Sequence, residues 1–271
     1  MPQDDLSIPS SRRAVFDANV VAFRTLVLKE IRRFLRIWPQ TLIPPAISMA
    51  LYFAIFGAII GRRIGEMAGF DYMEFIVPGL IMMSVITNAY ANVSASFFSA
   101  KFQKSIEALM VSPTPNSVML AGFVAGGVAR GLAVAAIVTV MAAFFVEIRI
   151  HDWFVTLGML LLTAILFSLA GFLNGLFADK FDDISIIPAF VLTPLTYLGG
   201  VFYALELLPD FWRTLSYFNP IVYVVSSFRY GFFGYSGGIP VAASFLAVAV
   251  FAGVFWCLSL WFLNRGVGLR T

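Results

Sequence analysis

The sequence predicts an all-α integral membrane protein with six transmembrane helices. Three segments lack Asp, Glu, Lys and Arg altogether, namely Ile37–Gly61, Phe75–Ala100 and Trp153–Ala178. Each is roughly 25 residues long and, at about 1.5 Å of rise per residue, is long enough to cross a hydrocarbon core of about 30 Å. Charged residues make up only 12% of the chain, against about 25% in soluble domains. Because the helices of a soluble domain need a polar face, repeated charge-free runs exclude that class.

The chain of 271 residues has room for six spans and no sizeable soluble domain, so residues 1–271 form one transmembrane domain. The expected spans are residues 40–60, 75–97, 127–146, 153–177, 184–205 and 241–263. The net charge of +3 is too small to indicate a nucleic-acid partner. The single cysteine, Cys257, lies in the last apolar run, so disulfides are not part of the design.

Lys and Arg are distributed unevenly over the two sides of these spans, and their distribution sets the orientation. One side carries the N-terminal segment and 13 of the 18 basic residues: Arg12, Arg13, Arg24, Lys29, Arg32, Arg33, Arg36, Lys101, Lys104, Arg130, Lys180, Arg265 and Arg270. The other side keeps Arg62, Arg63, Arg149, Arg213 and Arg229. The bias predicts that both termini are cytoplasmic.

Residues 19–38 have the pattern of an amphipathic helix rather than of a span. Apolar residues recur at three- and four-residue spacing, and basic residues fill the rest: Val20, Phe23, Val27, Ile31, Phe34 and Trp38 alternate with Arg24, Lys29, Arg32, Arg33 and Arg36. Such a helix lies in the headgroup plane and faces anionic lipid. The alternative is a basic flank that only fixes orientation. Pro39, Pro44 and Pro45 then turn the chain into the first span and kink it.

Residues 206–238 predict a re-entrant helical hairpin on the outer side, between the fifth and sixth spans. Thr214–Phe228 is apolar but only about 15 residues long, which is too short to span, and Asn219-Pro220 interrupts it. Backbone breaks at membrane depth are tolerated where protein rather than lipid surrounds them.

The residues give little support to catalysis or metal binding. The only histidine, His151, sits in a short outer loop beside Asp152, and Asp182-Asp183 fits a solvated loop end better than a metal pair. No Gly-x-x-x-x-Gly-Lys-Ser/Thr loop occurs, so any ATP must be bound by another polypeptide. Arg130 is essentially the only ionisable residue in a span and is expected near the inner interface. Spans without Asp or Glu argue against a proton-driven carrier.

Polar residues follow one face of the second span at four-residue spacing: Ser84, Asn88, Asn92 and Ser96. Thr193, Thr196 and Tyr197 form a looser set on the fifth span. Such stripes hydrogen-bond across helix interfaces or line a substrate path, and both roles remain open.

The cytoplasmic segment 101–116 reads as a short amphipathic helix stopped by Ser112-Pro113-Thr114-Pro115. A rigid charged helix between two spans is a good mechanical contact for a partner, although an ordinary loop is the simpler interpretation.

The stretch Leu192–Arg229 carries small residues, then Leu208-Pro209, then Pro220 after ten intervening residues, followed by Tyr223 and Arg229. Together with Ser105–Pro113, this order resembles the membrane subunits of ABC exporters of the ABC type-2 permease family. The resemblance covers nearly the whole chain.

The resemblance implies a homodimer of this chain in a bacterial inner membrane, with two copies of a separate ATPase that binds ATP and Mg²⁺. No cofactor is expected on this chain. The residues implied in ATPase coupling are Arg32, Arg33, Lys101, Lys104, Ile106, Glu107, Leu109, Ser112 and Pro113. The outer gate and signature residues are Gly199, Gly200, Pro209, Pro220, Tyr223 and Arg229. The modest polar stripes favour an amphipathic or lipid-like cargo.

Two alternatives belong to other classes. A membrane enzyme acting on lipids would need a catalytic constellation near Glu206, Asp210, Arg213 and Arg229. A gradient-driven carrier would work without any ATPase.

Overall fold

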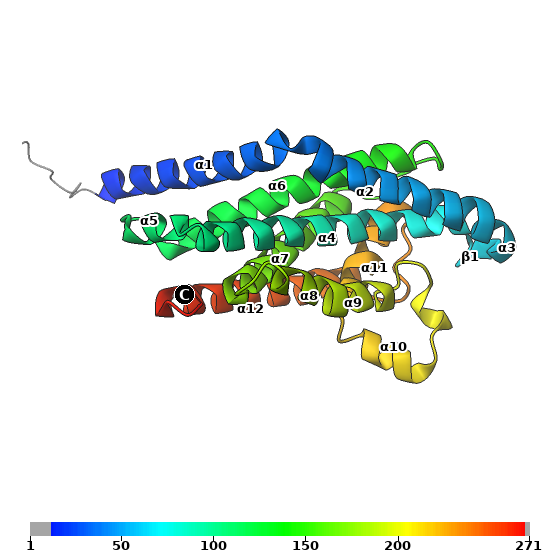
Figure 1. Cartoon of the computed structure of the whole chain (residues 1–271). Helices are drawn as coiled ribbons and strands as arrows, with labels where there is room; N and C mark the ends of the chain where they lie inside the picture. The colour runs from blue at the N-terminus through cyan, green and yellow to red at the C-terminus, as the bar shows by residue number, and fades with distance from the viewer. Residues whose placement is uncertain (1–11, 269–271) are drawn as a thin grey trace, which may run out of the picture.

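The computed structural model describes residues 12–268, whose long helices lie lengthwise beside one another (Figure 1). Expectations that concern residues 1–11 and 269–271, including Arg270 and the chain ends themselves, lie outside the described residues.

Within the described part, five helices are long and apolar enough to cross a membrane: Trp38–Gly61, α4 (Tyr72–Phe102), α6 (Asn116–Ala142), α7 (Trp153–Phe177) and α12 (Val241–Arg265). The most apolar stretch of α4 is 83% buried, whereas those of Trp38–Gly61 and α12 are 12% and 17% buried. α4 is therefore the central helix of the bundle, and it packs on α6 and α7. The other two leave most of their apolar surface for lipid or a partner.

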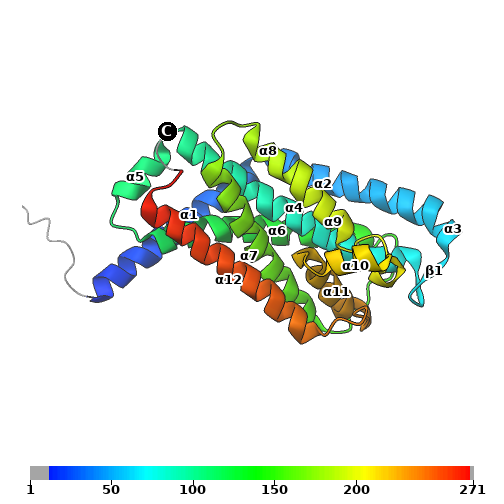
Figure 2. The same ribbon diagram turned by 90° about the horizontal axis from the view of Figure 1, so that it is seen from below.

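The amphipathic segment forms α1 (Arg12–Arg36), which is longer than the expected 19–38 and packs along α6. The chain bends at Ile37, and α2 (Trp38–Tyr52) follows, continued by a π-helical stretch, Phe53–Gly61, and a short α3 (Arg62–Ile64) (Figure 2). Trp38 is therefore the first residue of the span and not the last residue of α1. Pro44 and Pro45 lie inside α2 without ending it.

The third long helix, α6, begins at Asn116, whereas residues 127–146 were expected. Its glycines obscured the start, since glycine weakens a helix in isolation and is kept here for close packing. This start places Arg130 near the middle of α6, whereas the expected range 127–146 placed it in the first turn.

The expected fifth span, 184–205, is shorter and irregular. It consists of α8 (Asp183–Ile187), a π-helical turn (Pro188–Leu192) and α9 (Thr193–Leu198). These 16 residues rise about 24 Å, which is less than a hydrocarbon core. The helix stops at Gly199 and Gly200, because Gly200 has φ +75°, a conformation that favours glycine.

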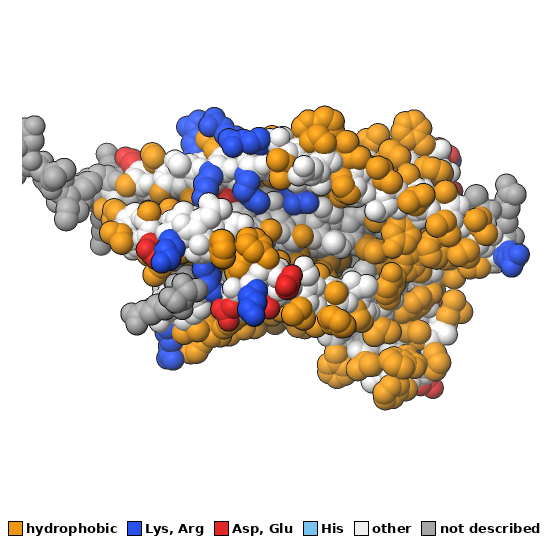
Figure 3. All heavy atoms as spheres, viewed as in Figure 1, with side chains coloured by type: hydrophobic (Ala, Val, Ile, Leu, Met, Phe, Trp, Pro, Cys, Tyr) orange, Lys and Arg blue, Asp and Glu red, His pale blue; other side chains and the backbone are white. Residues whose placement is uncertain are grey.

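The ends of the helices meet shorter elements. A two-stranded ribbon, β1 (Glu66–Met67) and β2 (Phe70–Asp71), precedes α4. A 3₁₀ turn (Leu205–Leu207) leads to α10 (Asp210–Ser216), which projects from the bundle (Figure 1), and then to α11 (Pro220–Phe233), which packs on α4, α7 and α12. At the opposite end lie α5 (Ser105–Val111), the α7–α8 loop and the C-terminal end of α12. Lys and Arg gather over α1 and that end, while hydrophobic side chains dominate around α2 and α10 (Figure 3).

Candidate functional site

The polar stripe on α4 is buried, and the structure divides it into two pairs. Asn92 and Ser96 bond to α1, while Ser84 and Asn88 line a cavity between α2, α4 and α6. One pair therefore joins two helices, and the other borders a hollow.

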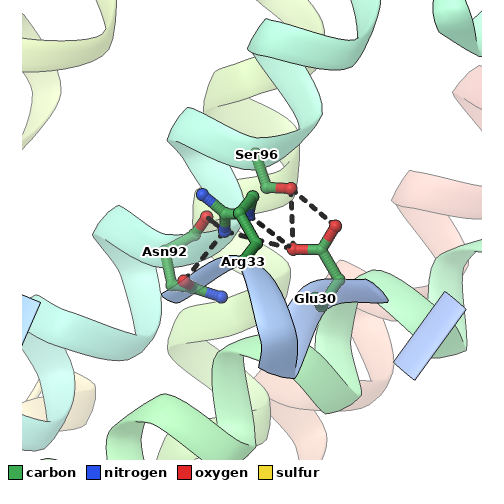
Figure 4. Close-up of polar contacts among 4 residues, drawn as sticks. All are labelled: Glu30, Arg33, Asn92 and Ser96. Carbon is green, nitrogen blue, oxygen red and sulfur yellow. Dashed lines mark hydrogen bonds and ion pairs between the residues drawn. The ribbon is translucent and has the colours of Figure 1, made fainter. Parts of the chain in front are cut away.

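The first pair belongs to a polar cluster that ties α1 to α4 (Figure 4). The Ser96 hydroxyl donates to both carboxylate oxygens of Glu30, at 2.8 and 2.7 Å. Arg33 donates to Glu30 Oε2 from Nε (3.2 Å) and Nη2 (3.1 Å), and Nη2 also reaches Asn92 Oδ1 at 2.9 Å. Because Glu30 is only 1% exposed, this carboxylate depends on these donors in place of water.

Glycines on α6 explain how α1 comes so close. A Cβ on Gly122 would lie 2.7 Å from Leu26 Cβ, and one on Gly126 would overlap the Glu30 side chain. The sequence interpretation missed Glu30, although a signal was present: it is the only acidic residue between 19 and 38. A lone carboxylate among the basic residues of 24–36 indicates a partner on a neighbouring element.

The second pair lies beside Arg130. Arg130 Nη2 donates to Asn88 Oδ1 at 3.1 Å and to the Thr41 carbonyl at 3.4 Å. That carbonyl lies four residues before Pro45, which has no N–H to offer it. Arg130 thus supplies the donor that Pro45 removes from α2.

The cavity beside Arg130 measures about 340 Å³. Its polar side is formed by Gln40, Ser48, Ser84, Thr87, Asn88 and Arg130, and its apolar side includes Pro44, Met49 and Tyr52. A hollow with both kinds of lining suits an amphipathic molecule.

The expected coupling segment contains the seven-residue helix α5. Glu107 is exposed, Leu109 is partly buried and Ile106 is buried against the core. Lys104, which precedes α5, has φ +57° and makes the tight turn from α4. Ser112 Oγ donates to the Leu109 carbonyl at 2.6 Å and closes the helix before Pro113.

Lys101 differs from the surface contact that was expected. Its ammonium is buried and donates to the carbonyls of Leu176 and Ala178 at 3.1 and 2.9 Å, at the C-terminal end of α7. A cation there complements the helix dipole and satisfies carbonyls without helical partners. Lys101 therefore holds α4 to α7 and is not available for direct contact with a partner.

The sequence interpretation also missed an apolar surface beside Glu107. Met110 and Val111 are 46% and 87% exposed, and Phe102, next to α5, is 64% exposed and stacks edge-on against Phe181. Exposed apolar side chains grouped next to a charged residue are typical of an interaction site.

On α1, Arg32 and Arg33 line an open groove of about 510 Å³ with Lys29 and Arg36. Its basic lining suits an acidic partner surface or anionic headgroups.

At the opposite end, Arg229 on α11 holds the turn after α9. It is buried and donates to the Gly200 carbonyl at 2.9 Å and to the Phe75 carbonyl at 3.4 Å. Its guanidinium stands 3.8 Å from the centre of the Phe75 ring. A Cβ on Gly79 would lie 2.7 Å from the Val201 carbonyl, so this turn rests directly on α4.

The remaining signature residues shape the same region. Pro209 precedes α10 and Pro220 opens α11, where a missing N–H is harmless. Asn219 caps α11 and donates to the Leu195 carbonyl at 2.6 Å, which links α11 to α9. Tyr223 Oη donates to the Tyr217 carbonyl at 2.8 Å, and Gly199 leaves room for Ile221.

The polar set on the fifth segment is not a uniform face. Thr193 is exposed and donates to the Pro188 carbonyl, whereas Thr196 is buried and donates to the Leu192 carbonyl. Tyr197 is half exposed and lies in an aromatic cluster with Phe202, which also contacts Tyr52. The cluster joins α9 to α2.

Loop residues that could suggest chemistry have structural partners. Backbone N–H groups of Asp179 and Lys180 donate to Asp183 Oδ2 at 3.0 and 2.9 Å, and these bonds lower the pKa of the Asp183 carboxyl. The His151 ring packs edge-on against Tyr230. Among residues 12–268, no group of three His, Cys, Asp or Glu could hold a metal ion.

Comparison with known proteins finds matches over most of the chain. The family model described as ABC-2 type transporter matches residues 21–233, a range that runs from α1 to the end of α11. The inner membrane transport permease YadH of Escherichia coli (strain K12) is 59% identical over 251 residues, which cover 93% of this chain and 98% of that protein. Nodulation protein J of Sinorhizobium fredii is 22% identical over 210 residues, 77% of this chain and 80% of that protein.

Proposed function

The chain belongs to the ABC-2 type transporter family, and from this premise we propose that it is the permease subunit of an ATP-driven exporter in a bacterial inner membrane. Two copies form the translocation pathway, and two copies of a separate ATPase bind ATP and Mg²⁺ on the cytoplasmic side. The basic end of the bundle, with α5, faces the cytoplasm, as the positive-inside rule requires. The fifth of the six spans is formed by residues 184–205, which contain most of α8, then α9 and the turn that follows, and α10–α11 form the outer re-entrant hairpin.

A surface stripe on the first span supports the homodimer. Large apolar side chains recur every fourth residue and stay exposed in the single chain: Ile43, Ile47, Leu51, Ile55 and Ile59. Residues four apart lie on one helix face, so the stripe is a continuous seam. A second copy covers this seam, and the pathway runs beside it, past Ser84, Asn88, Thr193, Thr196 and Tyr197.

The observation that carries the proposal is the construction of α5. It is rigidly attached to α4 through the turn at Lys104 and the buried Ile106, yet it presents Glu107 and an apolar surface outward. Within residues 12–268, no ion pair holds Glu107. A charge without a partner beside exposed Met110 and Val111 suits a contact that another subunit completes. Closure of the ATPases on ATP would then push α5 and, through it, α4.

The test is a charge reversal. We expect Glu107→Arg to weaken binding of the ATPase subunit at least about tenfold, or about 1.4 kcal/mol. The proposed contact pairs Glu107 with a basic group of the ATPase, and the reversal places two positive charges against each other. Glu66→Arg is the matched control, since Glu66 is an exposed glutamate at the other end of the molecule. Co-purification and permease-dependent ATP hydrolysis in nanodiscs are measured for both variants, with thermal unfolding to check folding. Wild-type coupling in Glu107→Arg would remove the assigned contact. Transport by the purified chain with no ATPase present would overturn the proposed function.

A further inference from the structure

The cavity between α2, α4 and α6 contains a positive charge that the described residues do not balance. Arg33 and Arg130 reach α4 on adjacent turns, at Asn92 and Asn88. Arg33 is paired with Glu30, but within residues 12–268 no carboxylate pairs with Arg130. The two cations and one carboxylate leave one positive charge, and it sits at the wall of the cavity.

Arg130 also has donors to spare. Its Nη2 is used by Asn88 and Thr41, but Nε is buried without a hydrogen-bond partner among the described residues. A guanidinium presents five donors in a planar fork that matches carboxylate and phosphate oxygens. An unpaired cation in the middle of a membrane helix is costly, so such a residue marks a site that an anion completes.

The rest of the cavity fits a molecule with one anionic end. Asn88 donates its amide N–H to the Ser84 carbonyl at 3.0 Å, which turns its oxygen toward Arg130 and fixes the guanidinium. Ser48 offers a further hydroxyl, whereas the Thr87 hydroxyl donates to the Met83 carbonyl at 2.9 Å. Met49, Tyr52 and Met83 form an apolar wall. The volume of about 340 Å³ admits a headgroup with the first part of an alkyl chain.

We propose that this cavity binds the phosphate or carboxylate group of an anionic amphipathic molecule, and that Arg130 is the residue that binds this group. The inference rests on the proposed export function in one respect: it names the chemical class of the cargo. The same chemistry is offered by a resident anionic phospholipid, and the experiment separates the two sources.

The first arm measures binding without any ATPase. The purified full chain in neutral detergent is titrated with dodecyl phosphate, with dodecyl maltoside as the neutral comparison and inorganic phosphate as the free anion. A charge-assisted contact predicts that Arg130→Gln weakens dodecyl phosphate binding about 10- to 100-fold. Asn88→Asp is the sharper variant, because it places a carboxylate at the amide position, 3.1 Å from Arg130. This internal carboxylate pairs with the guanidinium and competes with the added anion. We expect it to weaken binding as much as Arg130→Gln while the protein stays folded.

Two controls match these changes. Asn92→Asp makes the same substitution one turn away, where Arg33 already has a carboxylate, and Arg149→Gln removes an exposed loop cation. Both should keep wild-type affinity for dodecyl phosphate. Wild-type affinity in a folded Asn88→Asp variant would overturn the inference, as would equal binding of dodecyl maltoside.

The second arm assigns the source. Native mass spectrometry of wild-type and Arg130→Gln protein detects a retained phospholipid, and Arg130-dependent retention identifies a resident lipid. Stimulation of ATP hydrolysis by dodecyl phosphate in the permease–ATPase complex identifies a cargo site. Failure of the ATPase to associate would contradict the proposed function alone, since the binding arm does not use it.

Discussion

The Glu30 cluster offers a prediction whose size can be worked out from the structure. An isosteric Glu30→Gln substitution keeps the volume of the side chain but removes its charge. Ser96 and Arg33 then lose an ionic acceptor, and charge-assisted bonds contribute about 1.5–3 kcal/mol each in soluble proteins. Two facts reduce this figure: the Arg33 side chain is 34% exposed and thus screened, and hydrogen bonds between membrane helices average about 0.6 kcal/mol. We therefore expect a loss of about 1.5 kcal/mol in the free energy of unfolding.

A double-mutant cycle with Ser96→Ala isolates the contact between α1 and α4. Each variant and the double variant are unfolded in the same neutral detergent, and a coupling energy of about 0.5–1.5 kcal/mol is expected because the two side chains bond directly. Asp17→Asn, an exposed position on the same α1, is the control and should change stability by less than about 0.5 kcal/mol. Additive effects of Glu30→Gln and Ser96→Ala would refute the view that this contact ties the two helices.

Three further predictions concern the two ends of the molecule. Arg229→Lys loses the planar contact with Phe75, so the turn 199–204 should open more readily by about 1–2 kcal/mol. Thiol labelling of Ala204→Cys, a buried position in this turn, should then be about 5–30-fold faster in a Cys257→Ser background, and an unchanged rate would contradict this. Lys104→Asn should fold normally, since Asn tolerates positive φ, whereas Lys104→Val should unfold about 1–2 kcal/mol more easily; a loss of ATPase coupling in the Asn variant would show that the lysine charge itself is used. The pKa of Asp183 is lowered by its backbone donors, so its contribution to stability is present above the unfolded pKa of about 3.9 and is lost as the pH falls through the folded value. The difference in melting temperature between wild type and Asp183→Asn should therefore shrink below about pH 4, and a constant difference would argue against this contribution.

The sequence predicted the elements whose limits depend on local chemistry. α7 spans Trp153–Phe177, the expected range, because Asp152 accepts from the N–H groups of Phe154 and Val155 and so fixes its first turn. Charge-free length was enough to place Trp38–Gly61, α4 and α7, since a bilayer admits few other structures.

Tertiary contacts decided the features that the sequence did not predict. α6 begins before residue 127, the expected start, and its first half contains Gly122 and Gly126, which allow close contact with α1. A single sequence cannot distinguish glycines kept for helix packing from glycines that end a helix. Lys101 has the composition of a surface residue, but its burial depends on where α7 ends, 75 residues later in the chain. Glu30 and Arg130 became meaningful only when α1 and α6 were placed beside α4.

The contacts of α4 divide the molecule into a rigid part and a softer one. Gly171 and Gly175 bring the backbone of α7 against Tyr90 and Ser94, and Lys101 pins the ends of the two helices together. Backbone contact of this kind cannot slide without steric overlap, so α4 and α7 move as a unit. α1 is instead held to α4 by the side chains of Arg33 and Glu30, and α2 is held to α4 through Arg130 of α6. Such long side chains change rotamer more easily than a backbone moves. A push on α5 would therefore shift α4 relative to α2, and the cavity at Arg130 lies on that boundary. Under the proposed function, this geometry would couple the end of the chain that contacts the ATPase to the proposed binding site without any deformation of the central helix.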